Sequence, residues 1–278
     1  TMTKLIRHAL NTSQWNACQD VLEPLDGYFN MRGLDEEARA VVDLIRTATE
    51  EPAGQPPSLD SEDGKLWLFA VGSEANRQLR RHQLDAAHQT YNDLRVALEN
   101  SPKSSTQQSY LATLYHQLGM VAQDRGDLDQ ADGWYRKSLT IEEELGNRPG
   151  MATSYHQLGI VAQLRGDLDQ ADGWYRKSLT IKEELGSTGQ GITLAQMGLL
   201  AEQQGCLNEA FGYAIRAVAL FEEFPHRSSG TSPAQLARLT SQHGDTALRD
   251  AWTATTGNQI PADVSNWIIE QDKGATDE

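Results

Sequence analysis

Two histidines carry the type of side chain that binds a metal ion or exchanges a proton. His116 and His156 stand forty residues apart, in two stretches of nearly identical sequence. If each stretch forms one unit of a repeating helical structure, their rings lie on the order of 10 Å apart, which is the spacing of packed helices. Two nitrogens that share one zinc ion must each lie about 2 Å from it. We therefore predict no metal site and no cofactor, and we expect both rings to serve as hydrogen-bond donors or acceptors.

Motifs of enzyme active sites are absent from the sequence. It contains no GxxxxGK[ST] phosphate loop, no GxGxxG fingerprint, no GxSxG elbow and no HExxH pair. Carboxylates are numerous, but nothing in their positions predicts a raised pKa. We predict that the protein has no catalytic site.

A repeat of about forty residues must position these side chains. The segment Tyr115–Asn147 recurs as Tyr155–Ser187, and a looser copy, shifted by one residue, covers Leu194–Phe224. The two close copies differ at four places, where Met120, Asp124, Glu142 and Asn147 become Ile160, Leu164, Lys182 and Ser187. Internal repeats of this length are typical of solenoid proteins.

Each copy is expected to form two helices joined by a Gly-Asp turn. Apolar residues of the first half recur at spacings of three and four, as on one face of an α-helix. Gly126 then ends this helix, and Asp127 is placed to cap the next one. Small residues at Gly119 and Ala131 allow the two backbones to approach, and Tyr135 fills the space beside them.

This pattern resembles the tetratricopeptide repeat, the helix-turn-helix unit of many scaffold and adaptor proteins. The resemblance rests on an aromatic residue, Leu-Gly, Ala, Gly, Leu, Ala and Tyr in this order, at Tyr115, Leu118, Gly119, Ala122, Gly126, Leu128, Ala131 and Tyr135. The period is forty residues instead of thirty-four, so the second helix is expected to be longer by about one and a half turns. In this it is similar to kinesin light chain and to arrays on bacterial signalling ATPases of the STAND class. The resemblance covers roughly residues 110–224.

The resemblance implies an all-α fold, a right-handed superhelical solenoid of about five helix pairs with a C-terminal helical cap. Degenerate helix pairs are expected over 1–49 and 65–100, because apolar residues recur at helical spacing there, with a Pro- and Gly-rich loop over 50–64 between them. The clear repeats span 105–147, 148–187 and 188–224. Three capping helices are predicted over 233–242, 246–256 and 261–271, within a capping region of residues 232–271, followed by a disordered tail over 272–278.

The resemblance also implies that one face of each first helix lines a concave groove that holds a peptide. The expected binding residues on this face are Thr113, His116, Gln117, Met120, Gln123, Asp124, Thr153, His156, Gln157, Ile160, Gln163, Leu164, Gln196 and Glu202. Stacking is expected to align them in rows, one formed by Gln117, Gln157 and Gln196 and the other by Gln123, Gln163 and Glu202. Since an extended peptide advances roughly 3.3 Å per residue, one amide per repeat could meet every third backbone unit. The alternative is that these amides face solvent or bond within the array.

An aromatic residue stands one place before the packed tyrosine position of each second helix. These residues are Trp134, Trp174 and Tyr213. Side chains of this kind either cover the seam between repeats or bind a partner, and we favour the seam.

Composition excludes several classes of partner. A net charge of −15 makes nucleic acid an unfavourable ligand, because phosphate binding depends on clustered Lys and Arg. The sequence has no apolar run of the roughly 18 to 20 residues that a membrane-spanning helix needs. Cys18 and Cys206 are far apart and indicate no disulfide framework, so the reducing cytoplasm is the expected location.

Three hypotheses about function follow. The first is a non-catalytic module that binds a peptide or a partner domain in its groove. The second, taken from the resemblance, is the sensor segment of a larger STAND-type signalling ATPase, against which a native gene beginning at this chain's first residues would count. The third is self-assembly into dimers or filaments by end-to-end stacking of repeats.

Overall fold

The fold is all-helical. The computed structural model describes residues 2–50, 55–221 and 225–275, and over those residues it contains fourteen α-helices and one short 3₁₀ helix. This confirms the predicted fold class. No helix among the described residues is long and apolar enough to cross a membrane.

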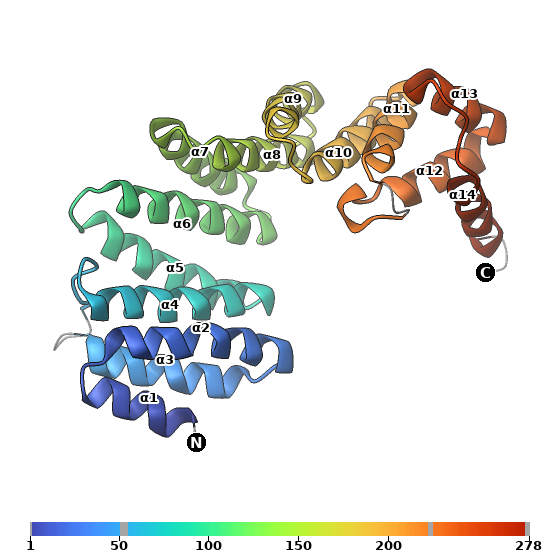
Figure 1. The fold of residues 1–278 in the computed structure, drawn as a ribbon. Helices are drawn as coiled ribbons and strands as arrows, with labels where there is room; N and C mark the ends of the chain where they lie inside the picture. The colour runs from blue at the N-terminus through green and yellow to red at the C-terminus, as the bar shows by residue number, and fades with distance from the viewer. Residues whose placement is uncertain (1, 51–54, 222–224, 276–278) are drawn as a thin grey trace. The chain divides into compact units, whose positions relative to one another are not determined.

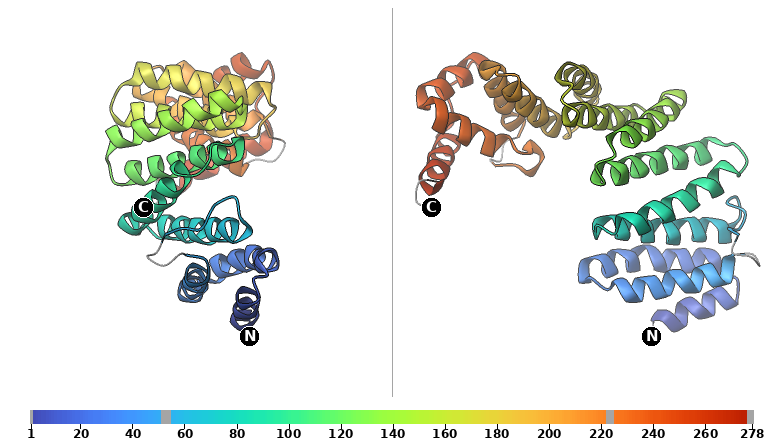
Figure 2. Two further views of the ribbon diagram at one scale, coloured as in Figure 1. Left: turned by 90° about the vertical axis from the view of Figure 1, so that its left-hand side faces the viewer. Right: turned by 180° about the vertical axis from the view of Figure 1, so that it is seen from behind.

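The chain divides into two compact units, Thr1–Leu145 and Gly146–Glu278. Helices of the first unit follow one another in successive layers (Figures 1 and 2). They are α1 Met2–Asn11, α2 Trp15–Arg32, α3 Asp35–Thr49, α4 Glu62–Arg80, α5 Leu84–Glu99, α6 Ser105–Asp124 and α7 Leu128–Leu145. The second unit contains α8 Arg148–Leu164, α9 Leu168–Glu184, α10 Gln190–Gln203, α11 Leu207–Ala219, η1 Arg227–Ser229, α12 Ser232–His243, α13 Asp245–Thr256 and α14 Ala262–Ala275.

One turn recurs between the two helices of five pairs: α2–α3, α4–α5, α6–α7, α8–α9 and α10–α11. In each turn a residue with positive φ lies between the helices, namely Gly33, His82, Gly126, Gly166 and Gly205. The second residue of each turn then donates its amide to a carbonyl five residues earlier, as Asp127 does to Ala122 at 2.9 Å. Glycine adopts positive φ without steric cost, whereas His82 carries it at φ 55°. The shared turn provides fixed points by which the helix pairs can be aligned residue by residue.

Two parts of the chain differ from the sequence expectation. Helix α1 was missed, although Ile6 and Leu10 are buried and pack in one core with α2, α3 and α4. At the other end, α14 continues to Ala275, so the expected disordered tail is wrong for residues 272–275. A single glycine, Gly274, does not end a helix whose preceding turns have formed. Residues 276–278 of the expected tail lie outside the described part of the chain.

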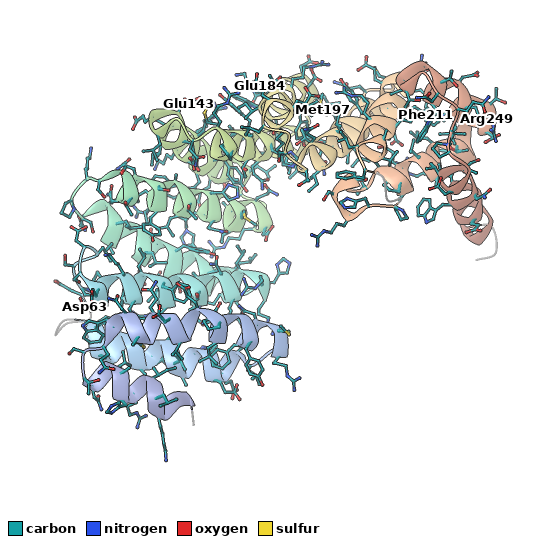
Figure 3. The ribbon with its side chains drawn as sticks, in the orientation of Figure 1. Asp63, Glu143, Glu184, Met197, Phe211 and Arg249 are labelled. Carbon is teal, nitrogen blue, oxygen red and sulfur yellow. The ribbon has the colours of Figure 1, made fainter. Side chains whose placement is uncertain are left out.

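Each unit is held by two apolar cores, which lie between successive helix layers. In the second unit, Met197 of α10 and Phe211 of α11 belong to these cores and are buried (Figure 3). In the α6–α7 and α8–α9 pairs, Gly119 and Gly159 of the first helix lie directly against a tyrosine ring of the second. A methyl group on Gly119 would lie 2.5 Å from the ring of Tyr135, and one on Gly159 would lie equally close to Tyr175. These glycines are required for packing, as their sequence pattern predicts.

Replacing Gly119 by alanine is expected to destabilise the protein by about 1 to 2 kcal/mol. Overpacking against the Tyr135 ring outweighs the roughly 0.5 to 1 kcal/mol by which alanine improves an exposed helix. The matched control is Gly133→Ala in α7, where an added methyl group meets nothing within 4 Å and stability should rise. Denaturant midpoints of both variants would check this, and a Gly119→Ala protein as stable as the control would contradict it.

Candidate binding groove

A pocket of about 390 Å³ lies in the first unit, along one face of α4. Residues of α4 line it at helical spacing: Lys65, Leu68, Phe69, Gly72, Ser73 and Asn76. Side chains of α2, α5 and α6 complete the wall: Gln19, Glu23, Tyr91, Leu94, Leu98, Tyr110, Thr113, Leu114 and Gln117. The lining is mostly apolar with a few polar side chains, which is the usual composition of a ligand site.

Buried charge fixes α2 beside α4 and so sets one wall of the pocket. The guanidinium of Arg77 is only 5% exposed and pairs with Asp26 of α2 and with Glu74, the latter at 3.0 Å. Closer to the start of α4, Asn16 donates to Glu62 at 2.7 Å. A buried pair of this kind loses several kcal/mol when one partner is removed, so the two helices are held in a fixed register.

The pocket exists because Gly72 has no side chain at a place that is filled in other helix pairs. Counted back from the turn residue, Gly72, His116 and His156 occupy the same position, ten residues before His82, Gly126 and Gly166. In α6 the His116 ring packs on Tyr135 with centroids 5.4 Å apart, and in α8 the His156 ring packs on Tyr175 at 5.6 Å. Their counterpart in α5 is Tyr91, which lines the pocket instead of lying under a histidine.

Space beside Gly72 is open, since a methyl group added there meets nothing within 4 Å. A glycine inside a helix costs about 0.5 to 1 kcal/mol relative to alanine, and no close packing requires this one. Gly119 and Gly159 differ from it, because each of them is pressed against a tyrosine ring.

The third copy fills the same place in another way. Ala195 and Ala214 stand at the histidine and tyrosine positions of α10 and α11. The segment after α11 covers this part of α10: a methyl group on Gly230 would lie 3.1 Å from Ala195, and one on Gly198 would lie 2.6 Å from Gln235 of α12. Four helix pairs can be compared at this position. Gly72 in the α4–α5 pair lines an open pocket, whereas the protein itself fills the equivalent space in the other three pairs.

Polar groups at the pocket are placed by contacts of their own. The Tyr91 hydroxyl donates to Asn76 Oδ1 at 2.6 Å, and burial raises the pKa of this tyrosine, so the hydroxyl stays protonated. Because Asn76 accepts through its oxygen, its amide nitrogen retains two donor hydrogens for a ligand. In the pocket lining, Gln19 donates to Glu23 at 3.2 Å.

A second chamber of about 390 Å³ continues the first toward the beginning of α4 and α6. The two chambers share Lys65, Leu68, Leu98 and Tyr110. Gly64 fixes the loop that bounds the second chamber, since a methyl group there would lie 2.0 Å from the Ser58 carbonyl oxygen. Together the chambers form a groove, which we call the α4 groove. Asp63 stands in the first turn of α4, the helix that the groove follows (Figure 3).

Two of the predicted binding residues in α6 lie in this groove, Thr113 and Gln117. The others in α6 take other positions: Met120 is half-buried and Asp124 exposed, while Gln123 accepts from the Tyr135 hydroxyl at 3.2 Å. His116 is half-buried against Tyr135, and burial lowers its pKa.

Predicted binding residues in the second unit are largely engaged within the protein. Gln163 accepts from Tyr175 at 2.8 Å and donates to Gln203 at 2.9 Å, so the expected row with Gln123 is used for internal contacts. Glu202 accepts from Arg238 and Gln235 of α12, at 2.8 and 3.1 Å. Both side chains therefore take part in hydrogen bonds within the protein.

The remaining residues of the expected face in the second unit vary in exposure. Thr153 and Leu164 are exposed, Ile160 packs against a core, and Gln157 and Gln196 are half-buried. The Gln157 side-chain oxygen is buried without a hydrogen-bond partner among the described residues.

His156 corrects the sequence prediction most clearly. It is 9% exposed, so it lies inside the helix array and does not line an open surface. Its Nδ1 lies 3.2 Å from the Thr193 hydroxyl, which accepts from the Lys182 ammonium at 2.7 Å. Burial, together with the nearby Lys182 charge, lowers the pKa of His156 to about 3. Burial also lowers the pKa of Lys182 to about 8.

Trp134 covers a seam between helix layers, as expected. Its ring stacks on Tyr115 at 5.5 Å and 16°, with the Lys137 ammonium 4.3 Å from its centroid and Arg95 of α5 at 5.9 Å. Trp174 stacks in the same way on Tyr155, at 5.6 Å and 18°. These aromatic residues have a structural role.

Sequence reasoning missed the α4 groove residues, above all Gly72, Asn76 and Tyr91. It examined the two clear copies, whereas the pocket lies in a degenerate one. An alignment of this copy on its turn, with His82 placed at the Gly126 position, would have identified these residues. That alignment puts Phe69, Gly72, Ser73 and Asn76 at the positions of Thr113, His116, Gln117 and Met120.

Comparison with known proteins agrees with this architecture. A family model described as the tetratricopeptide repeat matches residues 110–184. Residues 110–184 therefore match the tetratricopeptide repeat. No curated protein matches the sequence.

Solved structures of such repeats share the fold at low sequence identity. BtubC (BKLC) from P. vanneervenii superposes with a TM-score of 0.63 at 14% identity, covering 86% of this chain and 91% of that one. RapI in its apo form gives 0.64 at 13% identity, covering 93% and 73%. The Rap conjugation gene regulator of plasmid pLS20, solved in complex with the Phr* peptide, gives 0.59 at 14% identity, covering 99% and 76%.

Acid should destabilise the protein through His156. Its folded pKa of about 3 lies below the ordinary value of 6.5, so the unfolded chain binds more protons between these two values. The contribution of a neutral His156 is thus complete above pH 6.5 and is lost as pH falls toward 3. From pH 6.5 to 4.5 the loss is about 2 to 3 kcal/mol, at 1.36 kcal/mol per pH unit.

A His156→Gln variant isolates this contribution, because glutamine keeps a polar contact to Thr193 without titrating. Denaturant unfolding of both proteins at pH 7, 5.5 and 4.5 should show the wild-type protein losing more stability than the variant. Parallel losses would show that His156 is accessible to protons in the folded state.

Proposed function

We propose that this protein is a non-catalytic interaction module that binds an extended peptide in the α4 groove. The observation that carries the proposal is the vacancy at Gly72, at a position that the other three copies fill with a histidine ring or with the following segment. The likeness to a repeat protein solved with a peptide supports the same conclusion.

The groove is suited to an extended chain by the spacing of its polar groups. Ser73 and Asn76 stand on α4, while Thr113 and Gln117 stand across the pocket on α6. Neighbouring helices are about 8 to 10 Å apart, so polar groups on the two sides can meet every third residue of a peptide. Each such hydrogen bond adds only about 0.5 to 1.5 kcal/mol, so burial of an apolar side chain in the pocket must provide much of the affinity.

Replacing Gly72 by histidine should abolish binding, because it introduces the side chain that closes the same place in α6 and α8. The probe is a library of random heptapeptides displayed on mRNA and selected against the wild-type protein. Selected peptides, measured by fluorescence polarisation, should bind the Gly72→His variant at least tenfold more weakly.

Gly133→His is the matched control, as it makes the same change at another open helical glycine that lies outside the groove. It should leave peptide affinity within twofold of wild type. Circular dichroism and denaturant midpoints verify that both variants fold. Equal binding by wild type and Gly72→His, or a selection that enriches no peptide, would overturn the proposal.

Two narrower hypotheses from the sequence remain proposals. One places the chain in a larger STAND-type signalling protein, and the other in a self-assembling scaffold. Light scattering over a range of concentrations tests the second, because end-to-end assembly predicts a mass that rises with concentration. The proposed location remains the reducing cytoplasm, which the free thiols of Cys18 and Cys206 favour.

A further inference from the structure

We propose that the ligand of the α4 groove continues beyond the second chamber into a third one, where a lysine or arginine side chain of the ligand contacts Asp93 and Val96 of α5. This inference rests on the proposed function, and it adds a subsite and the chemical class of the residue that occupies it. Three observations carry it: a cavity that joins the groove, a carboxylate without an ion pair, and an exposed aliphatic side chain beside that carboxylate.

The third chamber has a volume of about 670 Å³ and lies between the segment 55–59, which precedes α4, and one face of α5. It shares Leu59, Ser101 and Pro102 with the second chamber. A chain that occupies the second chamber can therefore pass over these three residues into the third. The α4 groove thus continues from the first helix of this pair onto the second.

Contacts within the protein hold the walls of the third chamber in place. Pro56, Pro57 and Pro102 line it, and the ring of a proline fixes the φ angle of its backbone. Gln107 of α6 donates to the Leu98 carbonyl oxygen at 2.7 Å and so ties the beginning of α6 to the end of α5. A chamber with fixed walls requires little ordering when a ligand enters, which favours binding.

Asp93 provides the charge of the third chamber. Among the described residues that line the chamber, it is the charged one. Its side chain is exposed and accepts from Gln89 at 2.8 Å, but it forms no ion pair with any residue of the described ranges. A carboxylate keeps several acceptor sites after one such contact, so a cationic group of the ligand can bind here. The net charge of −15 also attracts a basic ligand from a distance.

Val96 makes the site suited to a long basic side chain in particular. It lines the same chamber and is 42% exposed, although it is aliphatic. Residues three apart on a helix have Cβ atoms about 5 to 6 Å apart, so Val96 lies next to Asp93 on α5. Lysine and arginine place their methylene stem on apolar surface and keep the charged end in water. The stem would cover Val96, and the charged end would reach Asp93.

The length of the path sets the length of the ligand. Along α4 the lining runs from Asn76 to Lys65, which is about 16 Å at 1.5 Å per residue, and along α5 it runs from Asn100 to Asp93, about 10 Å. An extended peptide advances roughly 3.3 Å per residue, so about five residues follow α4 and about three follow α5. A heptapeptide fits the α4 groove but ends before Asp93.

Extension of a groove-binding peptide tests the inference. A heptapeptide selected against the wild-type protein is lengthened by four random residues, at its amino end in one library and at its carboxyl end in another, and both libraries are selected again. One of the two should yield peptides that bind at least tenfold more tightly than the parent heptapeptide. Lysine or arginine should be present among the added residues.

Substitutions in the third chamber should act on the extension alone. Asp93→Asn should weaken the extended peptide at least threefold and leave the parent heptapeptide within twofold. Changing the added basic residue to norleucine keeps the stem and removes the charge, so it should weaken binding to the wild-type protein equally and cause no further loss in Asp93→Asn. Val96→Ser should weaken the extended peptide at least twofold, because the stem loses its apolar contact.

Matched controls make the same changes outside the three chambers. Asp43→Asn in α3 and Val21→Ser in α2 alter exposed residues that line none of them. Both variants should bind the extended peptide within 1.5-fold of wild type. Circular dichroism and denaturant midpoints verify that all four variants fold.

Outcomes of the two proposals are distinguishable. A tenfold gain that depends on Asp93 and on the added basic residue supports both. Heptapeptides that discriminate against Gly72→His, but whose extended forms show no tenfold gain or keep it in Asp93→Asn, overturn the third-chamber inference and leave the groove intact. A gain carried by acidic or purely apolar residues also overturns it. Heptapeptides that bind wild type and Gly72→His equally, or a selection that enriches none, overturn both proposals.

Discussion

The close contact between the two helices of a pair is the constraint on which the rest of the structure depends. In the clear repeats a tyrosine of the second helix lies directly against a glycine of the first, within 2.5 Å of where a methyl group would stand. That contact leaves room on the first helix for one further side chain beside the ring. The residue at that position, which is Gly72 in α4 and a histidine in α6 and α8, decides whether the space beside the ring is open or filled.

The space beside this position of the second helix is filled differently in the pairs α4–α5, α6–α7, α8–α9 and α10–α11. His116 and His156 close two of them, and the segment after α11 closes the third over Ala195. At Gly72 the place lines a pocket. In the near-identical repeats a histidine ring fills this position, and the departure from their pattern at Gly72 creates the candidate site.

Internal hydrogen bonds explain why polar residues on a first helix need not serve a ligand. Gln123 and Gln163 accept from the tyrosine hydroxyl of their own pair, which would otherwise be buried without a partner. His156 is buried as a neutral ring on Thr193, and the same hydroxyl accepts from Lys182. Regular spacing in the sequence does not distinguish polar residues that bind a ligand from polar residues that form contacts within the protein.

The sequence by itself determined the helix pairs, their turns and the similarity of residues 110–184 to the tetratricopeptide repeat, because these follow from local periodicity and from glycines at positive φ. Of the residues that it predicted for the binding face, Thr113 and Gln117 line the pocket. Only the tertiary structure decided which repeat is open, because that depends on whether a side chain from another helix fills the space. His156, Gln163 and Glu202 occupy the expected face, yet neighbouring helices bury them or engage them in hydrogen bonds and ion pairs. Gly72 gives no periodic signal, and its role becomes visible when the structure shows that the space beside it is open and lines a pocket.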